Sequence, residues 1–293
     1  MIGDRKKLKK CLGCGKKKRI RPDRSYCSVQ CANQNHSRSN FSDKILVFGD
    51  VHFPHQDPLA WLVTMGIAED IKPTRVILNG DIMDCNSLSQ KFSQPGDGGY
   101  TFGQEVDITT RHLQQLRNTI RKSCEITYIE GNHEARFKGL LKTKDLLRLD
   151  GVKGLTLPDQ LGLKELGIDY VGCTGTKWFT TKVQIAHNWY VGHFDRIAQW
   201  PGYAAKNIQD RLSASFIAGH GHSGGWTHRK TANGVLHGIE GGCLSRLDPP
   251  YCDPTNWIQL LHVVTIEAGS DPIVERIHIN NGRARYGGRL YSA

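Results

Sequence analysis

Five short runs of aspartate, asparagine and histidine recur along the chain, each directly after an apolar stretch. They are Asp50-x-His52, Gly80-Asp81-x-x-Asp84, Gly131-Asn132-His133-Glu134, Gly192-His193 and Gly219-His220-x-His222. Carboxylate, amide and imidazole groups are the usual ligands of divalent cations in sites without thiolate. Each run by itself could be a set of polar residues in a turn. Together, the five runs predict a shared metal site.

The apolar stretches before the first three runs have the length and composition of buried strands. Strands are expected at Ile45–Phe48, Val76–Leu78 and Ile126–Ile129, with helices at Pro58–Ile71 and Gln104–Lys122. Strands that alternate with helices indicate βαβ units. In such sheets, functional groups gather beyond the carboxyl ends of the strands. We therefore expect the first three runs to meet at one edge of a sheet.

The second half of the chain is richer in expected strands and carries the last two runs. Strands are expected over residues 168–171, 178–180, 183–186, 189–191, 216–218, 235–239, 260–266 and 273–278. A helix is expected over residues 202–212. No window is apolar for long enough to span a membrane, so we expect no membrane partner.

The composition is that of a globular chain. Its 293 residues, of which 38% are hydrophobic, suffice for one large α/β domain or two small ones. No apolar signal region follows the basic N-terminus. The nine cysteines are an odd number, which argues for reduced thiols. We therefore expect a cytoplasmic protein.

The net charge of +11 is concentrated at the N-terminus. Residues 1–40 hold twelve Lys or Arg and two Asp, which leaves residues 41–293 close to neutral, at +1. A basic block of this kind is attracted to polyanions, above all to nucleic acid. The alternative is a solvated tail that aids solubility.

Four cysteines in this basic segment have the spacing C-x2-C-x12-C-x3-C. They are Cys11, Cys14, Cys27 and Cys31. Two close thiolate pairs joined by a short loop suit one tetrahedral structural zinc, and the segment resembles small treble-clef-like zinc fingers. We expect a basic finger over residues 1–36, a polar linker over 37–42 and the main domain over 43–293. The charge favours nucleic acid as the partner of the finger, although similar fingers also bind proteins.

The ordered series of five runs resembles the motifs of the calcineurin-like metallophosphoesterases, over roughly residues 43–280. The stretches "GNHEARF", "AAKNIQDRLSASFIAGHGH" and "GGCLSRLDPPYCDPTNW" look like the phage and prophage members, which would place the protein in a host cytoplasm. The resemblance implies an α/β fold, a four-layer α/β/β/α sandwich of two mixed β-sheets flanked by helices. It also implies a dinuclear metal-dependent phosphoesterase that works through a metal-bridging hydroxide.

The resemblance assigns a role to the polar residues of the motifs. One metal would be held by Asp50, His52, Asp81 and His222, and the other by Asp81, Asn132, His193 and His220. Asp81 is the natural bridge, because a carboxylate can bind two cations and an imidazole cannot. His133 would act as general acid or as a donor to a phosphoryl oxygen. The ligand types suit Mn, Fe, Ni, Zn or Mg and do not select one of them.

Several neighbouring residues have two interpretations. We prefer His193 to His187 for the fourth motif, because the apolar run "YVGHF" ends in Gly-His. Asp84 is expected to support the site by hydrogen bonding, and Glu134 to orient a neighbour or begin a helix. Two arginines, Arg136 and Arg196, could contact phosphate oxygens or be surface charges.

Three functions are compatible with these residues. The first is a phosphodiesterase or nuclease that acts on nucleic acid docked by the finger. The second is a phosphomonoesterase for a small molecule or a protein, with the finger as a protein-interaction module. The third is a nucleic-acid-binding protein without catalytic activity, against which the intact ligand set argues.

Overall fold

The computed structural model describes residues 7–10, 16–20, 43–89, 99–144, 146–149, 152–173, 177–232, 234–248 and 255–293. The chain divides into two compact units, and the larger consists of Lys44–Val264 and Val274–Ala293. In the smaller unit, strands β1 (Lys7–Lys10) and β2 (Lys17–Ile20) pair antiparallel. All four cysteines of the predicted finger, and the linker at 37–42, lie outside the described residues.

The first sheet of the larger unit has six strands, in the order β13-β12-β3-β4-β5-β6. Its parallel centre consists of β3 (Asp43–Phe48), β4 (Arg75–Asn79), β5 (Glu125–Ile129) and β6 (Ile168–Val171). The strands β12 (Gln259–Ile266) and β13 (Ile273–Ile279) extend it. The expected strands at the first three motifs are confirmed, and their carboxyl ends share one edge of the sheet.

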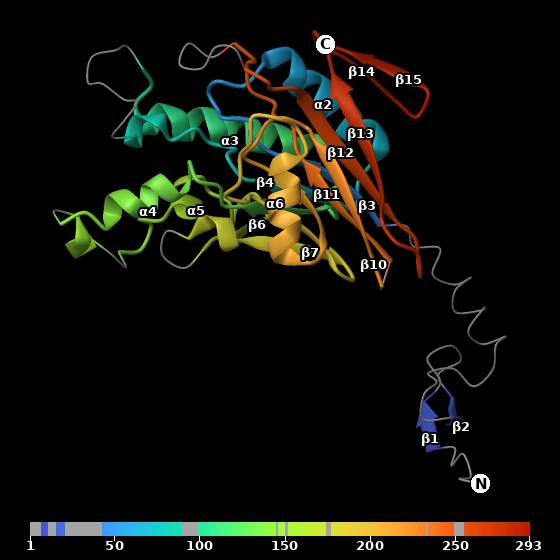
Figure 1. Cartoon of the computed structure of the whole chain (residues 1–293). Coiled ribbons are helices and arrows are strands. Elements are labelled where there is room, and N and C mark those ends of the chain that lie inside the picture. Colours follow the sequence, from blue (N-terminus) through green and yellow to red (C-terminus); the bar gives the residue numbers. More distant parts are fainter. Residues whose placement is uncertain are drawn as a thin grey trace. The chain divides into compact units, whose positions relative to one another are not determined.

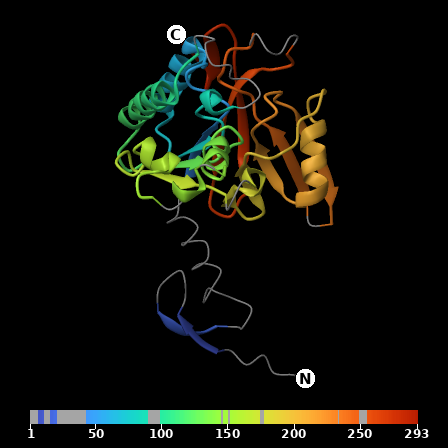
Figure 2. The same cartoon turned by 90° about the vertical axis from the view of Figure 1, so that its left-hand side faces the viewer.

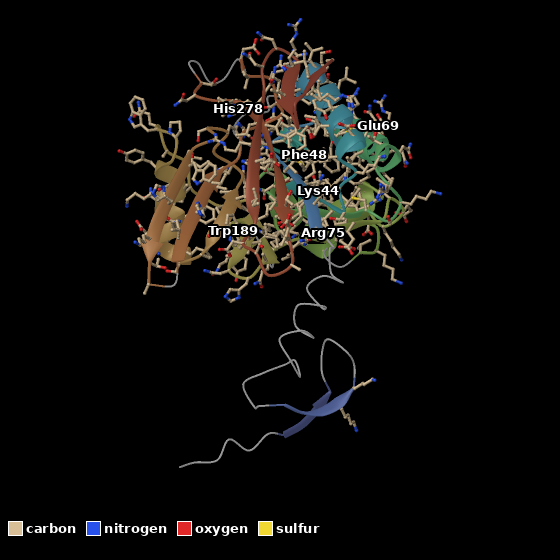
Figure 3. All side chains as sticks on the ribbon, turned by 90° about the vertical axis from the view of Figure 1, so that its right-hand side faces the viewer. Lys44, Phe48, Glu69, Arg75, Trp189 and His278 are labelled. Carbon is tan, nitrogen blue, oxygen red and sulfur yellow. The ribbon has the colours of Figure 1, made fainter. Side chains whose placement is uncertain are left out.

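Two long helices pack beside one another and cover the first sheet (Figure 1). The Asp57 carboxylate accepts backbone N–H bonds at the start of α2 (Pro58–Ile71), and Thr101 and Gln104 form a capping box on α3 (Phe102–Thr119). Trp61 joins the helices, because its Nε1 donates to Gln115 Oε1 at 2.8 Å. Its ring centroid also lies 6.1 Å from that of Phe48 in β3, the residue labelled in Figure 3.

The second sheet has five strands, in the order β10-β11-β9-β8-β7. They are β7 (Lys182–Ala186), β8 (Trp189–Gly192), β9 (Ser215–Ala218), β10 (Trp226–Thr231) and β11 (Gly234–Glu240). Helix α6 (Tyr203–Leu212) packs on this sheet through Ala205 and Ile208, which meet Phe216 of β9 (Figure 2). Parallel and antiparallel pairs both occur, so the predicted fold of two mixed sheets with flanking helices is confirmed.

The predicted strand at 178–180 is wrong. Trp178–Thr180 forms a turn of 3₁₀-helix, η3, in which the Thr180 and Thr181 N–H groups donate back to Lys177 and Trp178. Three apolar or β-branched residues indicate a strand only when a neighbouring strand pairs with them. In this segment the backbone hydrogen bonds form within one turn instead of to a neighbouring strand.

Several elements were not predicted, because their sequences carry few buried apolar side chains. They are η1 (Asn86–Leu88), α4 (Ala135–Leu141), η2 (Leu147–Leu149), α5 (Leu157–Gln160), β10, β14 (Arg283–Tyr286) and β15 (Arg289–Ser292). In β10, for example, exposed and half-buried residues alternate and none is buried. Among the residues that the structure describes, no helix has both the length and the apolar character needed to cross a bilayer.

Candidate metal centre

The side chains of all five motifs lie at the carboxyl ends of strands from both sheets. Asp50 and His52 follow β3, Asp81 and Asp84 follow β4, Asn132, His133 and Glu134 follow β5, His193 follows β8, and His220 and His222 follow β9. His193 crosses from the second sheet to the first, where its Nδ1 donates to the Asn79 carbonyl at 2.9 Å. The site therefore depends on how the two sheets face one another.

One cluster consists of Asp50, His52 and His222, whose ligand atoms all lie within 4.8 Å of one another. His222 Nε2 is 2.9 Å from Asp50 Oδ1 and 3.4 Å from His52 Nε2. All three side chains are buried. Three buried polar groups that converge on one point need either hydrogen bonds or a cation to offset the loss of water.

A second cluster consists of Asp81, His193 and His220, again within 4.8 Å. Asp81 Oδ2 is 3.2 Å from His193 Nε2, which also lies 3.0 Å from Asn132 Oδ1. The same Asp81 oxygen is 4.0 Å from His52 Nε2 of the first cluster. Asp81 therefore lies between the two clusters, where one carboxylate can reach both.

The charge balance of these clusters fits divalent cations. Burial alone would lower the pKa of His193, but the carboxylates of Asp81 and Asp50 raise that pKa to about 9. In the same way, Asp50 raises the pKa of His222 well above its ordinary value, against the effect of burial. The buried carboxylates thus favour positive charge at these points, which a divalent cation supplies. The mixed oxygen and nitrogen donors suit such a cation.

The backbone at the proposed ligands is strained. Asp50, His52, Asp81, His220 and His222 have φ values of 51°, 55°, 49°, 80° and 55°, in the left-handed region. This region is uncommon for residues other than glycine and costs on the order of 1 kcal/mol or more per residue. Strain that recurs at residues of one cluster indicates that the fold holds these side chains in place for function.

Glycines allow the backbone of the motif loops to pass close to the proposed ligands. A Cβ atom on Gly131 would lie 2.2 Å from Asp81 Oδ1 and 2.5 Å from the Asp81 nitrogen. A Cβ atom on Gly219 would lie 2.5 Å from His193 Nδ1. Neither position can take a side chain unless a ligand moves.

Asp84 contacts two histidines. Its Oδ1 lies 2.9 Å from His52 Nδ1 and 3.0 Å from His133 Nδ1. Burial would raise the pKa of Asp84, but hydrogen bonds from His133 and His52 hold it far below its usual range. Since Nδ1 of His52 donates to this carboxylate, its Nε2 is free to face Asp81 and His222. Asp84 thus orients the ring of His52, as the partners of metal-bound imidazoles commonly do.

Glu134 is a buried carboxylate that ties the loop after β4 to the loop after β5. It accepts backbone N–H bonds from Asp81, Ile82, Met83 and Gly131, and the Tyr128 hydroxyl donates to it at 2.7 Å. Burial is the main reason why its pKa is raised. The side chain makes no capping bond to α4, although Glu134 is the residue before that helix. Of the two roles considered, the contacts are those of an orienting residue.

The other candidate histidines and arginines differ in how deeply they are buried and in which groups they contact. His133 is half-buried, with Nε2 3.8 Å from Asp81 Oδ2. Arg136 donates to the Asp84 carbonyl at 3.0 Å and lies 3.2 Å from His133 Nε2. Arg196 instead lies 3.8 Å from the neighbouring Asp195, with its side chain 47% exposed. His187 is exposed in the turn between β7 and β8, whereas His193 is fully buried.

Two tryptophans border the centre, and neither was predicted from the sequence. The Trp178 ring centroid lies 5.2 Å from that of His220 and 5.6 Å from that of His193. The Trp257 centroid lies 4.3 Å from that of His222. Trp178 stands in the segment mistaken for a strand, and Trp257 lies 35 positions after its histidine, so neither carries a local signal.

Comparison with solved structures finds similar chains at low sequence identity. Vacuolar protein sorting 29 from Cryptosporidium parvum is 13% identical, with a TM-score of 0.43, over 87% of this chain and all of that chain. A dimetal phosphatase from Danio rerio is 14% identical, with a TM-score of 0.37, over 79% of this chain and 98% of that chain. Zinc-bound Vps29 from Entamoeba histolytica is 16% identical, with a TM-score of 0.35, over 81% and 99% of the two chains.

No curated protein matches the chain. The family profile of the calcineurin-like phosphoesterases, however, matches residues 43–236. That span is more than half of the chain and contains all five motifs. The chain therefore belongs to the calcineurin-like phosphoesterase family and is a metal-dependent phosphoesterase.

Proposed function

We propose that this phosphoesterase holds two divalent cations and hydrolyses phosphodiester bonds of nucleic acid. The observation that carries the dinuclear centre is the position of Asp81. Its Oδ2 lies 3.2 Å from His193 Nε2 in one cluster and 4.0 Å from His52 Nε2 in the other. Only a carboxylate can serve both positions at once, and this one is buried, with its backbone held by Glu134.

The two positions would be held by overlapping sets of side chains. Asp50, His52, Asp81 and His222 would hold one cation, and Asp81, Asn132, His193 and His220 the other. Bound there, Mn, Fe, Ni, Zn or Mg ions would neutralise charge on the phosphoryl oxygens and activate a water molecule. The hydrogen bonds of Asp84 to His52 and of the Asn79 carbonyl to His193 fix which ring nitrogen faces the centre.

His133 is the proposed proton donor to the leaving oxygen, or a hydrogen-bond donor to a phosphoryl oxygen. Its Nδ1 donates to the Asp84 backbone carbonyl at 2.6 Å, so that Nε2 points towards Asp81 without belonging to either proposed ligand set. Burial would lower the pKa of His133, but the charge of Asp81 raises it. A raised pKa keeps a proton available at neutral pH. The positive charge of Arg136, 3.2 Å from His133 Nε2, acts in the opposite direction and lowers that pKa, but the carboxylates outweigh it.

The charge distribution supports nucleic acid as the substrate. Residues 1–40 carry a net +10, whereas residues 41–293 carry +1. We propose that residues 1–36 form a docking module, stabilised by one zinc ion on Cys11, Cys14, Cys27 and Cys31. The module would bind phosphates without regard to sequence, and the catalytic unit would cleave the strand held near it.

Hydrolysis of bis-p-nitrophenyl phosphate, p-nitrophenyl phosphate, DNA and RNA with added Mn²⁺ tests the proposal. We expect cleavage of the diester and of nucleic acid, loss of activity with a chelator, and at least a hundredfold lower activity in Asp81→Asn. The substitution is needed as well as the chelator, because a chelator would also strip the proposed zinc. Hydrolysis of the monoester alone would replace the proposal by a phosphomonoesterase, and full activity of Asp81→Asn would overturn the dinuclear centre.

A further inference from the structure

Trp178 and Trp257 lie on the two different halves of the centre. Trp178 packs on His193 and His220, which belong to one proposed cation position, with ring centroids 5.6 and 5.2 Å apart. Trp257 packs on His222, which belongs to the other, at 4.3 Å. Both side chains are half-buried, so part of each indole is open to solvent. Each of the two proposed cation positions therefore has an indole beside one of its histidines.

The two tryptophans differ from those that serve the fold. Trp61 is 3% exposed, and Trp189 is 6% exposed and stacks on His237, so both pack inside the protein. Trp178 instead begins the single 3₁₀ turn η3, and Trp257 comes from the irregular segment before β12. The segment of Trp257 is fixed there, because the Ile258 N–H donates to the His222 carbonyl at 2.9 Å. Held backbones present the two rings at defined places.

The connection that follows His193 carries large exposed side chains and is hydrogen-bonded to the segment of Trp257. Asn256 Nδ2 donates to the Gln199 carbonyl at 3.2 Å, which joins this connection to the segment of Trp257. Ile197 and Trp200 on it, and Tyr203 at the start of α6, are 67%, 62% and 61% exposed. Large exposed apolar groups next to a site mark a binding surface more often than chance.

The charge of the larger part of the chain limits how it can hold a polyanion. Residues 41–293 carry only +1, so this part of the chain has no overall excess of positive charge comparable to that of residues 1–40. A duplex offers a protein chiefly its phosphates, because its bases are already stacked on each other. A single strand also offers unstacked base faces, and aromatic side chains bind those faces without regard to sequence.

We propose that Trp178 and Trp257 stack the two nucleobases that flank the scissile phosphate, so that the centre acts on single-stranded nucleic acid. This inference rests on the proposed phosphodiesterase function and adds the form of the substrate. Trp178 takes the base on the side of His193 and His220, and Trp257 takes the base on the side of His222. Trp200 of the connection after His193 and Tyr203 at the start of α6 extend the track to further bases.

Dinucleoside phosphates test the proposal, because each has a single scissile bond. We compare dithymidine phosphate with two analogues in which one or the other base is replaced by hydrogen. Removal of either base is expected to lower kcat/KM of the unmodified protein about tenfold. In Trp257→Leu, removal of one of the two bases should no longer lower kcat/KM. In Trp178→Leu, removal of the other base should no longer lower it. The variants Trp257→Phe and Trp178→Phe keep both penalties, because they keep an aromatic face.

The outcomes separate this inference from the function on which it rests. If the protein hydrolyses bis-p-nitrophenyl phosphate but cleaves all three dinucleoside phosphates equally well, base stacking is wrong and the phosphodiesterase stands. Faster cleavage of a duplex than of its separated strands would also overturn the inference. If no diester is hydrolysed, the proposed function fails first. A purely structural role for either tryptophan would lower all three rates together and leave the base dependence unchanged.

Discussion

At the scale of single residues, the site is a set of side chains that each bind or orient another. Asp84 shows the principle, because one carboxylate oxygen serves both His52 and His133. The left-handed backbone of His220 and His222 shows it again, since the turn of one short segment aims two imidazoles at two different clusters. Two predictions belong to this scale.

We expect Asp84→Ala to lower kcat/KM for bis-p-nitrophenyl phosphate by 10- to 100-fold, together with the affinity for the added metal. The reason is that His52 loses the carboxylate that fixes its ring, whereas His133 keeps the backbone carbonyl of residue 84 as its acceptor. Steady-state rates over a Mn²⁺ titration measure the effect. Asp210→Ala is the matched control, because Asp210 pairs with Lys206 and Arg229 at the surface. Equal behaviour of the two variants would argue against an orienting role.

We expect His220→Ala and His222→Ala to lose different cations. Each variant should bind one active-site metal where the unmodified protein binds two, because the two imidazoles belong to separate clusters. Metal content and isothermal titration, in the variants and in the exposed control His228→Ala, check this. The proposed zinc on the four N-terminal cysteines should stay bound in all of them. Loss of both active-site metals in either variant would show that the positions are not independent.

At the scale of secondary-structure elements, strand ends and the loops after them create the centre. The loops approach so closely that side chains are excluded at some of their positions, and Glu134 collects the free N–H groups of two loops. The geometry of the centre is thus a property of how β3, β4, β5, β8 and β9 end, rather than of any helix.

We expect Gly131→Ala to abolish activity while the protein stays folded. Its Cβ would lie 2.2 Å from Asp81 Oδ1, so Asp81 must move away from the position between the two clusters. Activity should fall by at least a hundredfold, since a displacement of about 1 Å at a site can cost that much. Gly103→Ala is the control, because nothing lies within 4 Å of its Cβ and it stands in α3. That variant should keep full activity and gain about 0.5–1 kcal/mol of stability. Activity of Gly131→Ala close to that of the control would contradict the crowding argument.

At the scale of the whole molecule, the properties to predict are the free energy of unfolding and the effect of the charge distribution on binding. The core of the larger unit contains a buried ionisable group away from the centre, His262 of β12, whose side chain is 2% exposed. The excess charge lies in the N-terminal segment, outside the family match at 43–236. Each of these features leads to a measurable prediction.

Burial, and then the positive charge of Arg276, lower the pKa of His262 to about 3. A histidine in the unfolded chain titrates near pH 6.5. Below that pH, His262 is therefore protonated in the unfolded chain but stays neutral in the folded chain. This group therefore stabilises the fold above pH 6.5 and loses that contribution as pH falls towards 3. The free energy of unfolding of His262→Phe, relative to that of the unmodified protein, should therefore rise by about 1.4 kcal/mol for each pH unit by which the pH falls between 6.5 and 4. Urea unfolding at several pH values measures it, and a pH-independent difference would contradict the assignment.

The affinity for a single-stranded oligonucleotide should fall steeply as the salt concentration rises if the N-terminal segment binds phosphates. Lys16 and Lys17 are exposed, and Lys16→Gln with Lys17→Gln should lower the log–log slope by about 0.7 for each phosphate that the variant no longer neutralises. Lys164→Gln with Lys230→Gln is the control with the same change in charge elsewhere. An unchanged slope in the first variant would favour a protein partner for this segment.

The fold was most predictable from the sequence where a feature is local. Strand ends such as Ile45–Phe48 before Asp50 could be predicted, because a buried strand needs consecutive apolar residues and the polar residue after it marks its end. The prediction failed at Trp178, where three residues suggested a strand that has no partner. The strand β10 and the β14–β15 pair were not predicted either, since half-exposed strands lack the apolar pattern by which a strand is recognised.

What the sequence by itself determined is the chemistry available. Five polar runs at strand ends point to the family and supply residue types that can bind metal, and they were expected to meet because the carboxyl ends of parallel strands share one edge. Only the tertiary structure decided which groups meet. The placement of Asp81 between His52 and His193, the shared oxygen of Asp84 and the two indoles beside the histidines involve residues far apart in the chain. Such contacts arise from the packing of two sheets against one another, which no local pattern encodes.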